Sequence, residues 1–269
     1  MYDIIFSDYD NTLYGKSGKI SEKTHKSIQK YIAQGGKFVI STGRIGASIL
    51  PIAKKLNLTD EIITSQGAEI YNISSNTCEK TTVLDREKVV EILKIAKERK
   101  YLAQCYCNNK IYADKNKLFN RFFTSFFGIE IIKEKDLIKK VENCELSPCK
   151  FEILLQESDT NSFVKEMAKA YPEFLFSKSA PVMVEIADRK ATKGEAVKYV
   201  LNKYNIAKEN AVAIGDGNND ITMLNAVGTK VAVGNSAKKL LSIADYVASD
   251  DGDAVSEIIE MILKGENIK

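Results

Sequence analysis

The chain has 269 residues, of which 44% are hydrophobic and 28% charged, which suggests one large domain or two modest ones and excludes a disordered chain. The formal net charge is +3, from 39 basic and 36 acidic residues without a long basic run, which argues against a nucleic-acid or membrane-surface protein. No apolar stretch reaches the roughly 18 residues of a membrane span. The N-terminal segment lacks the basic and apolar regions of a signal peptide, so we expect a cytoplasmic protein.

The first element we expect is a short buried strand, since residues 4–6 (IIF) are apolar and two of them are β-branched. The strand runs into SDYDNTL, which places Asp8 and Asp10 one residue apart. Carboxylates this close raise each other's pKa, and a bound cation relieves that cost. Because ligands bind at the carboxyl ends of parallel strands, we expect a divalent metal beside Asp8 and Asp10. An Asx-rich turn without a metal is the alternative.

Helices and strands alternate through the next fifty residues. We expect a helix over about 21–33, a strand over 37–40, a helix over about 47–56 and a strand over 61–64. With the first strand, this order predicts a right-handed, parallel, doubly wound unit. The polar clusters STGR at 41–44 and SQGAEIY at 65–71 follow the second and third strands. They therefore share one sheet edge with Asp8.

From residue 82 the sequence pattern changes, which predicts a second domain. We expect a charged helix over 86–100, strands over 102–107, 110–113, 149–155 and 182–186, and a helix over about 160–170. The strands alternate in polarity, which predicts a sheet that is covered on one side only. The aromatic run at 121–128 predicts helix packing; a lid or a dimer surface is the less favoured interpretation.

The five cysteines, at 78, 105, 107, 144 and 149, all lie in the middle of the chain. Their spacing does not match the usual pairs of a zinc site, and the single histidine, His25, is remote in sequence. We therefore favour reduced cysteines that pack as small hydrophobic residues over a zinc site.

The alternation of helices and buried strands that is seen in the first domain resumes near residue 185. Thr192 is an N-cap for a helix to about residue 204, with Lys193 in its first turn, and the strand at 211–214 (AVAI) runs into GDGNND at 215–220. Further strands follow at TKVAV and ADYVA, and a last helix begins after SDDGDAV. The sequence thus predicts an α/β protein: a Rossmann-like, doubly wound parallel core formed by residues 1–81 and 185–269, with an inserted α+β cap domain at 82–184.

One sheet edge collects residue types that suit phosphoryl transfer. Oxygen-rich carboxylates suit Mg²⁺, and these loops contain neither His nor Cys. A hydroxyl at Thr42, the backbone N–H of Gly43 and the ammonium of Lys193 can orient phosphoryl oxygens. One carboxylate can attack phosphorus, and a second can protonate the leaving oxygen. Taken singly, each residue also has a structural interpretation: a surface lysine, a helix cap or a turn.

Together these motifs resemble the haloacid dehalogenase superfamily. The matching segments are DYDNT at 8–12, STGR at 41–44, ATKG at 191–194 and GDGNND at 215–220. The inserted domain resembles the type-two cap of the Cof-like phosphatases. The resemblance implies that Asp8 is the nucleophile and Asp10 the general acid and base. It implies that Mg²⁺ is held by the Asp8 carboxylate, the Asp10 backbone carbonyl and Asp216, with Asp220 supporting the metal or Lys193. It also implies that the phosphoryl group is bound by Thr42, Gly43, Lys193 and Asn219.

Two residues depart from the family pattern. Asn11 stands where glycine is common, and Asn tolerates left-handed backbone better than most residues. Tyr9 is bulkier than usual, so it either narrows the approach or packs inside.

The function we expect is Mg²⁺-dependent hydrolysis of small phosphate esters, with sugar phosphates as the leading class. A phosphotransferase or phosphomutase on the same core, and a non-catalytic phosphate-binding module, are the alternatives. We expect the substrate to be selected by cap residues near 105–109 and 177–183. Oligomeric state stays open.

Overall fold

The computed structural model describes residues 2–15, 18–114, 129–249 and 252–268, so the aromatic run at 121–128 lies outside the described residues. The chain forms two compact units. The core unit comprises Met1–Arg44, Ile49–Lys80 and Thr192–Lys269, and the inserted unit comprises Ile45–Ser48 and Thr81–Ala191. The boundary predicted at residue 184 falls inside a strand of the inserted unit, Met183–Asp188.

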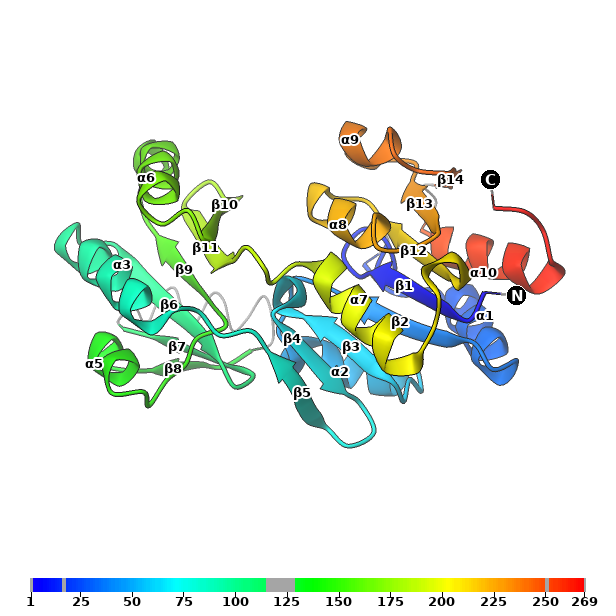
Figure 1. The fold of residues 1–269 in the computed structure, drawn as a ribbon, viewed down its shortest axis with the longest axis horizontal. Helices are drawn as coiled ribbons and strands as arrows, with labels where there is room; N and C mark the ends of the chain where they lie inside the picture. The colour runs from blue at the N-terminus through cyan, green and yellow to red at the C-terminus, as the bar shows by residue number, and fades with distance from the viewer. Residues whose placement is uncertain (1, 16–17, 115–128, 250–251, 269) are drawn as a thin grey trace. The chain divides into compact units, whose positions relative to one another are not determined.

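The core unit is built on an eight-stranded sheet in the order β14-β13-β12-β1-β2-β3-β4-β5 (Figure 1). Its strands are β1 (Ile4–Asp8), β2 (Lys37–Ser41), β3 (Glu61–Thr64), β4 (Glu69–Asn72), β5 (Thr77–Thr81), β12 (Ala211–Gly215), β13 (Thr229–Val233) and β14 (Tyr246–Ala248). The strands from β14 to β3 pair in parallel, and β4 pairs with β3 antiparallel. The strand order reverses between β1 and β12, which is where open α/β sheets bind ligands.

Helices cover both faces of this sheet, as a doubly wound fold requires. The helices are α1 (Glu22–Ala33), α2 (Gly46–Lys55), α7 (Lys193–Tyr204), α8 (Ile221–Leu224), α9 (Lys238–Leu241) and α10 (Ala254–Lys264), with single 3₁₀ turns at Ser65–Gly67, Lys208–Asn210 and Asn218–Asp220. Ile5 packs with the core of α1, α2 and α10, whereas Ile4 and Phe6 pack with α7, α8 and α9. Because neighbouring strand residues point to opposite faces, one apolar run fills both cores.

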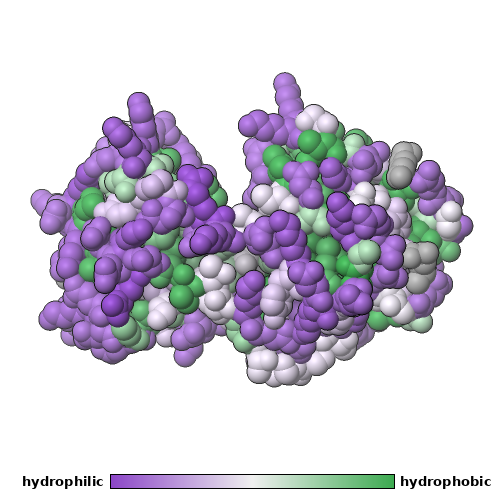
Figure 2. Space-filling model, in the orientation of Figure 1, coloured by the Kyte–Doolittle hydropathy of each residue, from purple (hydrophilic) through white to green (hydrophobic). Residues whose placement is uncertain are grey.

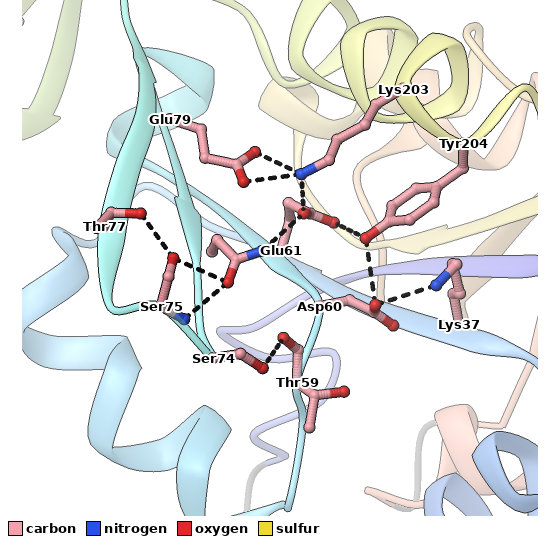
Figure 3. A network of polar contacts seen from close by, with 11 residues as sticks. Lys37, Thr59, Asp60, Glu61, Ser74, Ser75, Thr77, Glu79, Lys203 and Tyr204 are labelled. Atoms are coloured by element: carbon pink, nitrogen blue, oxygen red, sulfur yellow. Dashed lines mark hydrogen bonds and ion pairs between the residues drawn. The ribbon is translucent and has the colours of Figure 1, made fainter.

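Helix α7 runs between two polar clusters at its two ends. Its last turn carries Lys203 and Tyr204, which bind the buried carboxylate of Glu61 at the start of β3 over 2.5 Å and 2.6 Å. Lys203 also pairs with Glu79 of β5 at 2.6 Å, and Lys37 at the start of β2 completes the network through Asp60 (Figure 3). The far end of α7 is thereby fixed to the amino-terminal edge of the sheet, and its first residue, Lys193, belongs to the opposite edge.

The inserted unit has a six-stranded mixed sheet in the order β10-β11-β9-β6-β7-β8. Its elements are α3 (Arg86–Glu98), β6 (Leu102–Cys107), β7 (Lys110–Ala113), β8 (Ile131–Lys133), α5 (Leu137–Glu142), β9 (Lys150–Leu154), α6 (Glu157–Ala170), β10 (Phe174–Ala180) and β11 (Met183–Asp188). Strands β8 and β10 and helix α5 were not predicted from the sequence. Cys105 and Cys107 pack with the helices, and Cys149 is buried as well, whereas Cys78 and Cys144 are exposed.

A row of polar side chains from β6, β9 and β11 crosses the sheet of the inserted unit. Gln104 and Glu185 each lie opposite Glu152 in register. Glu152 accepts a hydrogen bond from Tyr106 at 2.7 Å, and Lys150 pairs with Glu185 at 2.5 Å. All five side chains are buried, so burial raises the pKa of Glu152 despite the nearby Lys150.

Charged and polar residues dominate the face of the molecule in Figure 2, with apolar side chains scattered among them. Among the described residues, the exposed large hydrophobic side chains are Val83, Leu175, Val182 and Val247, which lie in separate segments. Within the same ranges, none of the helices combines the length and the apolar character needed to cross a membrane.

Candidate active site

Asp8 is the last residue of β1, next to the point where the strand order reverses. It is 5% exposed. The turn that follows passes through Asn11 in the left-handed region (φ +61°), as expected from the tolerance of Asn for this conformation. Tyr9 is 2% exposed and stacks on Tyr14 with ring centroids 5.3 Å apart. Tyr9 therefore packs inside the core.

Lys193 joins Asp8 to the loop after β12. Thr192 caps α7 by accepting the Glu195 N–H, as predicted, and this cap fixes the position of the first turn. The Lys193 ammonium donates to Asp8 at 2.5 Å and to Asp220 at 2.6 Å. Lys193 is 1% exposed, which rules out the surface-lysine interpretation.

Asp220 organises the loop that runs from β12 into α8. Its Oδ2 accepts the backbone N–H groups of Asp216 and Gly217 at 3.1 Å and 2.9 Å, while its Oδ1 faces Lys193. Thr12 donates to the carboxylate of Asp216 at 3.1 Å, which ties the turn after β1 to the same loop. Asp220 thus acts as a cap and as an ion-pair partner at once, so the two interpretations of this residue are not exclusive.

The carboxylates of Asp8, Asp216 and Asp220 form a group whose oxygens lie within 4.8 Å of one another. Burial raises the pKa of Asp8 to about 8 against the opposing effect of Lys193, and Asp220 and Asp216 raise it further. The pKa of Asp216 is also raised, first by burial and second by the nearby charge of Asp220. Burial disfavours a charge on Lys193, but Asp8 and Asp220 outweigh it and raise the lysine pKa.

This donor set fits a hard divalent cation. Three carboxylates beside one ammonium leave an excess of negative charge in a buried place, and an oxygen-bound cation would neutralise that excess. The group includes Asp220, which the sequence predicted only as a supporting residue, and it does not include the Asp10 carboxylate. A zinc site of cysteines is not among the groups of potential ligands that the described part of the chain brings together.

The remaining predicted residues lie on the neighbouring loops. Thr42 is buried after β2, and its hydroxyl accepts the backbone N–H of Arg44 at 3.1 Å. Gly43 follows it directly. Asn219, in the 3₁₀ turn after β12, donates its side-chain N–H to Gln66 at 3.2 Å. The structure therefore brings Asp8, Lys193, Asp216 and Asp220 into direct contact range, while Thr42, Gly43 and Asn219 belong to adjoining loops.

Sequence reasoning missed Arg44 and Gln66. Arg44 holds Asp10 with a two-pronged ion pair, Nε to Oδ2 at 3.0 Å and Nη2 to Oδ1 at 2.6 Å, and its guanidinium lies 4.8 Å from the Tyr9 ring centroid. The signal was present, since Arg44 ends the STGR motif and two-pronged binding of carboxylates is characteristic of arginine. For Gln66, a polar residue before Gly67 at the end of a strand was the only sign.

The chain matches the family model of the haloacid dehalogenase-like hydrolases over residues 5–259. It is 26% identical to phosphatase YwpJ of Bacillus subtilis, over 97% of this chain and 99% of that protein. Among solved structures, a haloacid dehalogenase-like hydrolase from Bacteroides thetaiotaomicron superposes with a TM-score of 0.87 and 25% identity, covering 97% of this chain and 100% of that one.

A third comparison is with a solved structure whose description names a subclass. BT4131, described as a sugar phosphatase of HAD subclass IIB, has the same fold with a TM-score of 0.79 and 22% identity, covering 98% of this chain and 99% of that one. The parallel core, the inserted mixed sheet and the family match agree with the sequence motifs. The chain therefore belongs to the haloacid dehalogenase-like hydrolases, with the fold of their Cof-like IIB members.

Proposed function

We propose that this haloacid dehalogenase-type phosphatase is Mg²⁺-dependent, that it works through an aspartyl-phosphate on Asp8, and that its substrates are small phosphorylated metabolites, sugar phosphates first. The observation that carries the proposal is the buried contact of Lys193 with Asp8, beside Asp216 and Asp220, at the reversal point of the sheet. BT4131 is described as a sugar phosphatase, which makes sugar phosphates the first class to test.

In the proposed reaction, an Asp8 carboxylate oxygen attacks phosphorus and the ester P–O bond breaks. Asp10 gives a proton to the departing alkoxide. Water then attacks the phosphorus of the aspartyl-phosphate, Asp10 takes up a proton from this water, and free phosphate leaves with Asp8 restored. In this structure Arg44 fixes the orientation of the Asp10 carboxylate through its two-pronged ion pair.

The other site residues bind and position. Lys193 offsets charge on Asp8 and on the transferring group, and Asp220 holds Lys193 in place. The phosphoryl group would be bound by Thr42, Gly43, Lys193 and Asn219, and Mg²⁺ would be held by Asp8, the Asp10 carbonyl and Asp216. When bound, the metal supplies positive charge that neutralises the carboxylates and the phosphoryl oxygens.

The test is hydrolysis of an aryl phosphate and a panel of sugar and nucleotide phosphates, with Mg²⁺ or with EDTA. We expect Mg²⁺-dependent release of phosphate that falls at least about a thousandfold in Asp8→Asn, while the exposed Asp3→Asn, just before the same strand, keeps parental activity. Isomerised product without free phosphate would replace the hydrolase by a mutase. Phosphate-ester binding without any turnover across the panel would replace it by a binding module.

A further inference from the structure

A strained turn follows β3, and neither the motifs nor the proposed roles account for it. Ser65, Gln66 and Gly67 have φ angles of +52°, +61° and +99°. Residues other than glycine rarely adopt this conformation, and two of them in succession are a costly arrangement that persists only where the surroundings enforce it. Such strain is often found where a side chain has to be delivered to a functional site.

The surroundings enforce the turn from three sides. The backbone N–H groups of Ser65 and Gln66 donate to the carbonyls of Arg44 and Thr42 at 2.9 Å and 3.0 Å. The Ser65 hydroxyl donates to the buried carboxylate of Glu69 at 2.9 Å. On the third side, the turn approaches the start of α7 so closely that a Cβ on Gly67 would lie 2.2 Å from the carbonyl oxygen of Thr192.

The result is that the Gln66 side chain lies between two of the proposed phosphoryl-binding residues. Its Oε1 accepts the Asn219 Nδ2–H at 3.2 Å. Its Nε2 lies over Gly43, because a Cβ built on that glycine would be 2.5 Å from Nε2. Glycine at position 43 therefore leaves room for the Gln66 carboxamide.

We propose that Gln66 is a positioning residue that holds the Asn219 carboxamide in the orientation that binds the phosphoryl group. An Asn amide nitrogen carries two N–H donors. When Gln66 accepts one of them, the amide cannot rotate freely, and the second donor is left for a phosphoryl oxygen. The inference rests on the proposed function, and it adds to that function a residue that lies outside the four matched segments and acts through Asn219.

The test is a double-variant cycle on the dissociation constant of inorganic phosphate in the Mg²⁺-loaded protein, measured by calorimetry. We expect Gln66→Ala and Asn219→Ala each to weaken binding about tenfold, the effect of losing one hydrogen bond to a charged group. The double variant should bind no more weakly than Asn219→Ala alone, because the two residues act as one unit. Gln34→Ala, at an exposed helix end, is the matched control.

Gln66→Asn separates positioning from folding. Among residues with a side chain, Asn best tolerates a φ of +61°, so the unfolding midpoint should equal or exceed that of the parent. Its side chain is one methylene shorter, so phosphate binding should still weaken, and KM for an aryl phosphate should rise while kcat stays within about threefold. A Gln66→Asn variant that loses stability and phosphate affinity together would indicate a merely structural role.

The outcomes distinguish this inference from the function on which it rests. A parent that binds phosphate and hydrolyses esters while Gln66→Ala keeps parental affinity overturns the inference alone. Additive losses in the double variant also overturn it, because Gln66 would then act independently of Asn219. A parent that neither binds phosphate nor turns over any ester overturns the proposed function and the inference with it.

Discussion

Removing the Lys193 ammonium should destabilise the core unit in a pH-dependent way. In Lys193→Ala, the carboxylates of Asp8 and Asp220 lose a cation that lies 2.5 Å and 2.6 Å away. Counted over side-chain atoms alone, Lys193 is 0% exposed, Asp8 8% and Asp220 1%. Loss of one partner from a buried ion pair costs about 3–5 kcal/mol. We therefore expect the free energy of unfolding at pH 8, without metal, to fall by about that amount.

The sign of the pH effect follows from the carboxylates. Burial already raises the pKa of Asp8 to about 8, and without Lys193 it rises further. An acid with a raised folded pKa contributes stability that is largest at low pH and is lost as pH rises through the folded value. The deficit of Lys193→Ala should therefore grow as pH rises above 8, where Asp8 ionises in the parent but not yet in the variant, by up to about 1.4 kcal/mol for each pKa unit gained.

Urea denaturation in EDTA at pH 8 and pH 9.5 measures both quantities. Lys198→Ala is the matched control, since Lys198 lies on the same helix, is 58% exposed and pairs only with Glu195 in the salt bridges of the described residues; its loss should stay within about 0.5 kcal/mol. If Lys193→Ala were no less stable than Lys198→Ala, or if its deficit did not change with pH, the reasoning about the buried carboxylates would be refuted.

Three further variants test other parts of the structure. Glu61→Ala leaves Lys203 without its buried partner and should lower the free energy of unfolding by about 2 kcal/mol in urea titrations; a loss below about 0.5 kcal/mol would show that the network in Figure 3 contributes little. Gly67→Ala should lower the melting temperature more than Gly35→Ala, because both have positive φ but only Gly67 meets a main-chain carbonyl; equal losses would argue against the close contact. Glu152→Gln should melt above the parent at pH 8 and approach it near pH 4, since the raised pKa of Glu152 makes its ionisation unfavourable to folding; a lower melting temperature at pH 8 would contradict this.

The helices and the parallel strands of the core followed from local pattern, whereas β4 and β5 at the edge of the core sheet were not predicted. The runs at 4–6, 37–40, 61–64 and 211–214 are short, mostly apolar and rich in β-branched residues. Such a run is typical of a buried parallel strand. Strand β10 was missed because its sequence, FLFSKSA, loses its apolar alternation after Phe176, where only pairing with β11 sustains the strand.

The site residues that lie in sequence motifs could be predicted, whereas contacts between side chains of different loops could not. Lys193 and Asp8 are 185 residues apart, and no local pattern joins them; the predicted sheet edge and the family resemblance did. The pairing of Arg44 with Asp10 and the delivery of Gln66 to Asn219 depend on side-chain directions in loops. The strain at positions 65–67 is imposed by the surrounding loops and leaves no mark in the sequence beyond one glycine.

The most direct test of the proposed chemistry is to trap the phosphoryl group on Asp8. The parent and Asp10→Asn, which should slow breakdown of the intermediate, are mixed with an aryl phosphate and Mg²⁺, quenched in acid, digested and analysed by mass spectrometry. We expect a phosphoryl adduct on the peptide that contains Asp8, more abundant in Asp10→Asn and absent from Asp8→Asn. Hydrolysis that continues in Asp8→Asn, with no adduct on that peptide in any variant, would contradict Asp8 as the nucleophile.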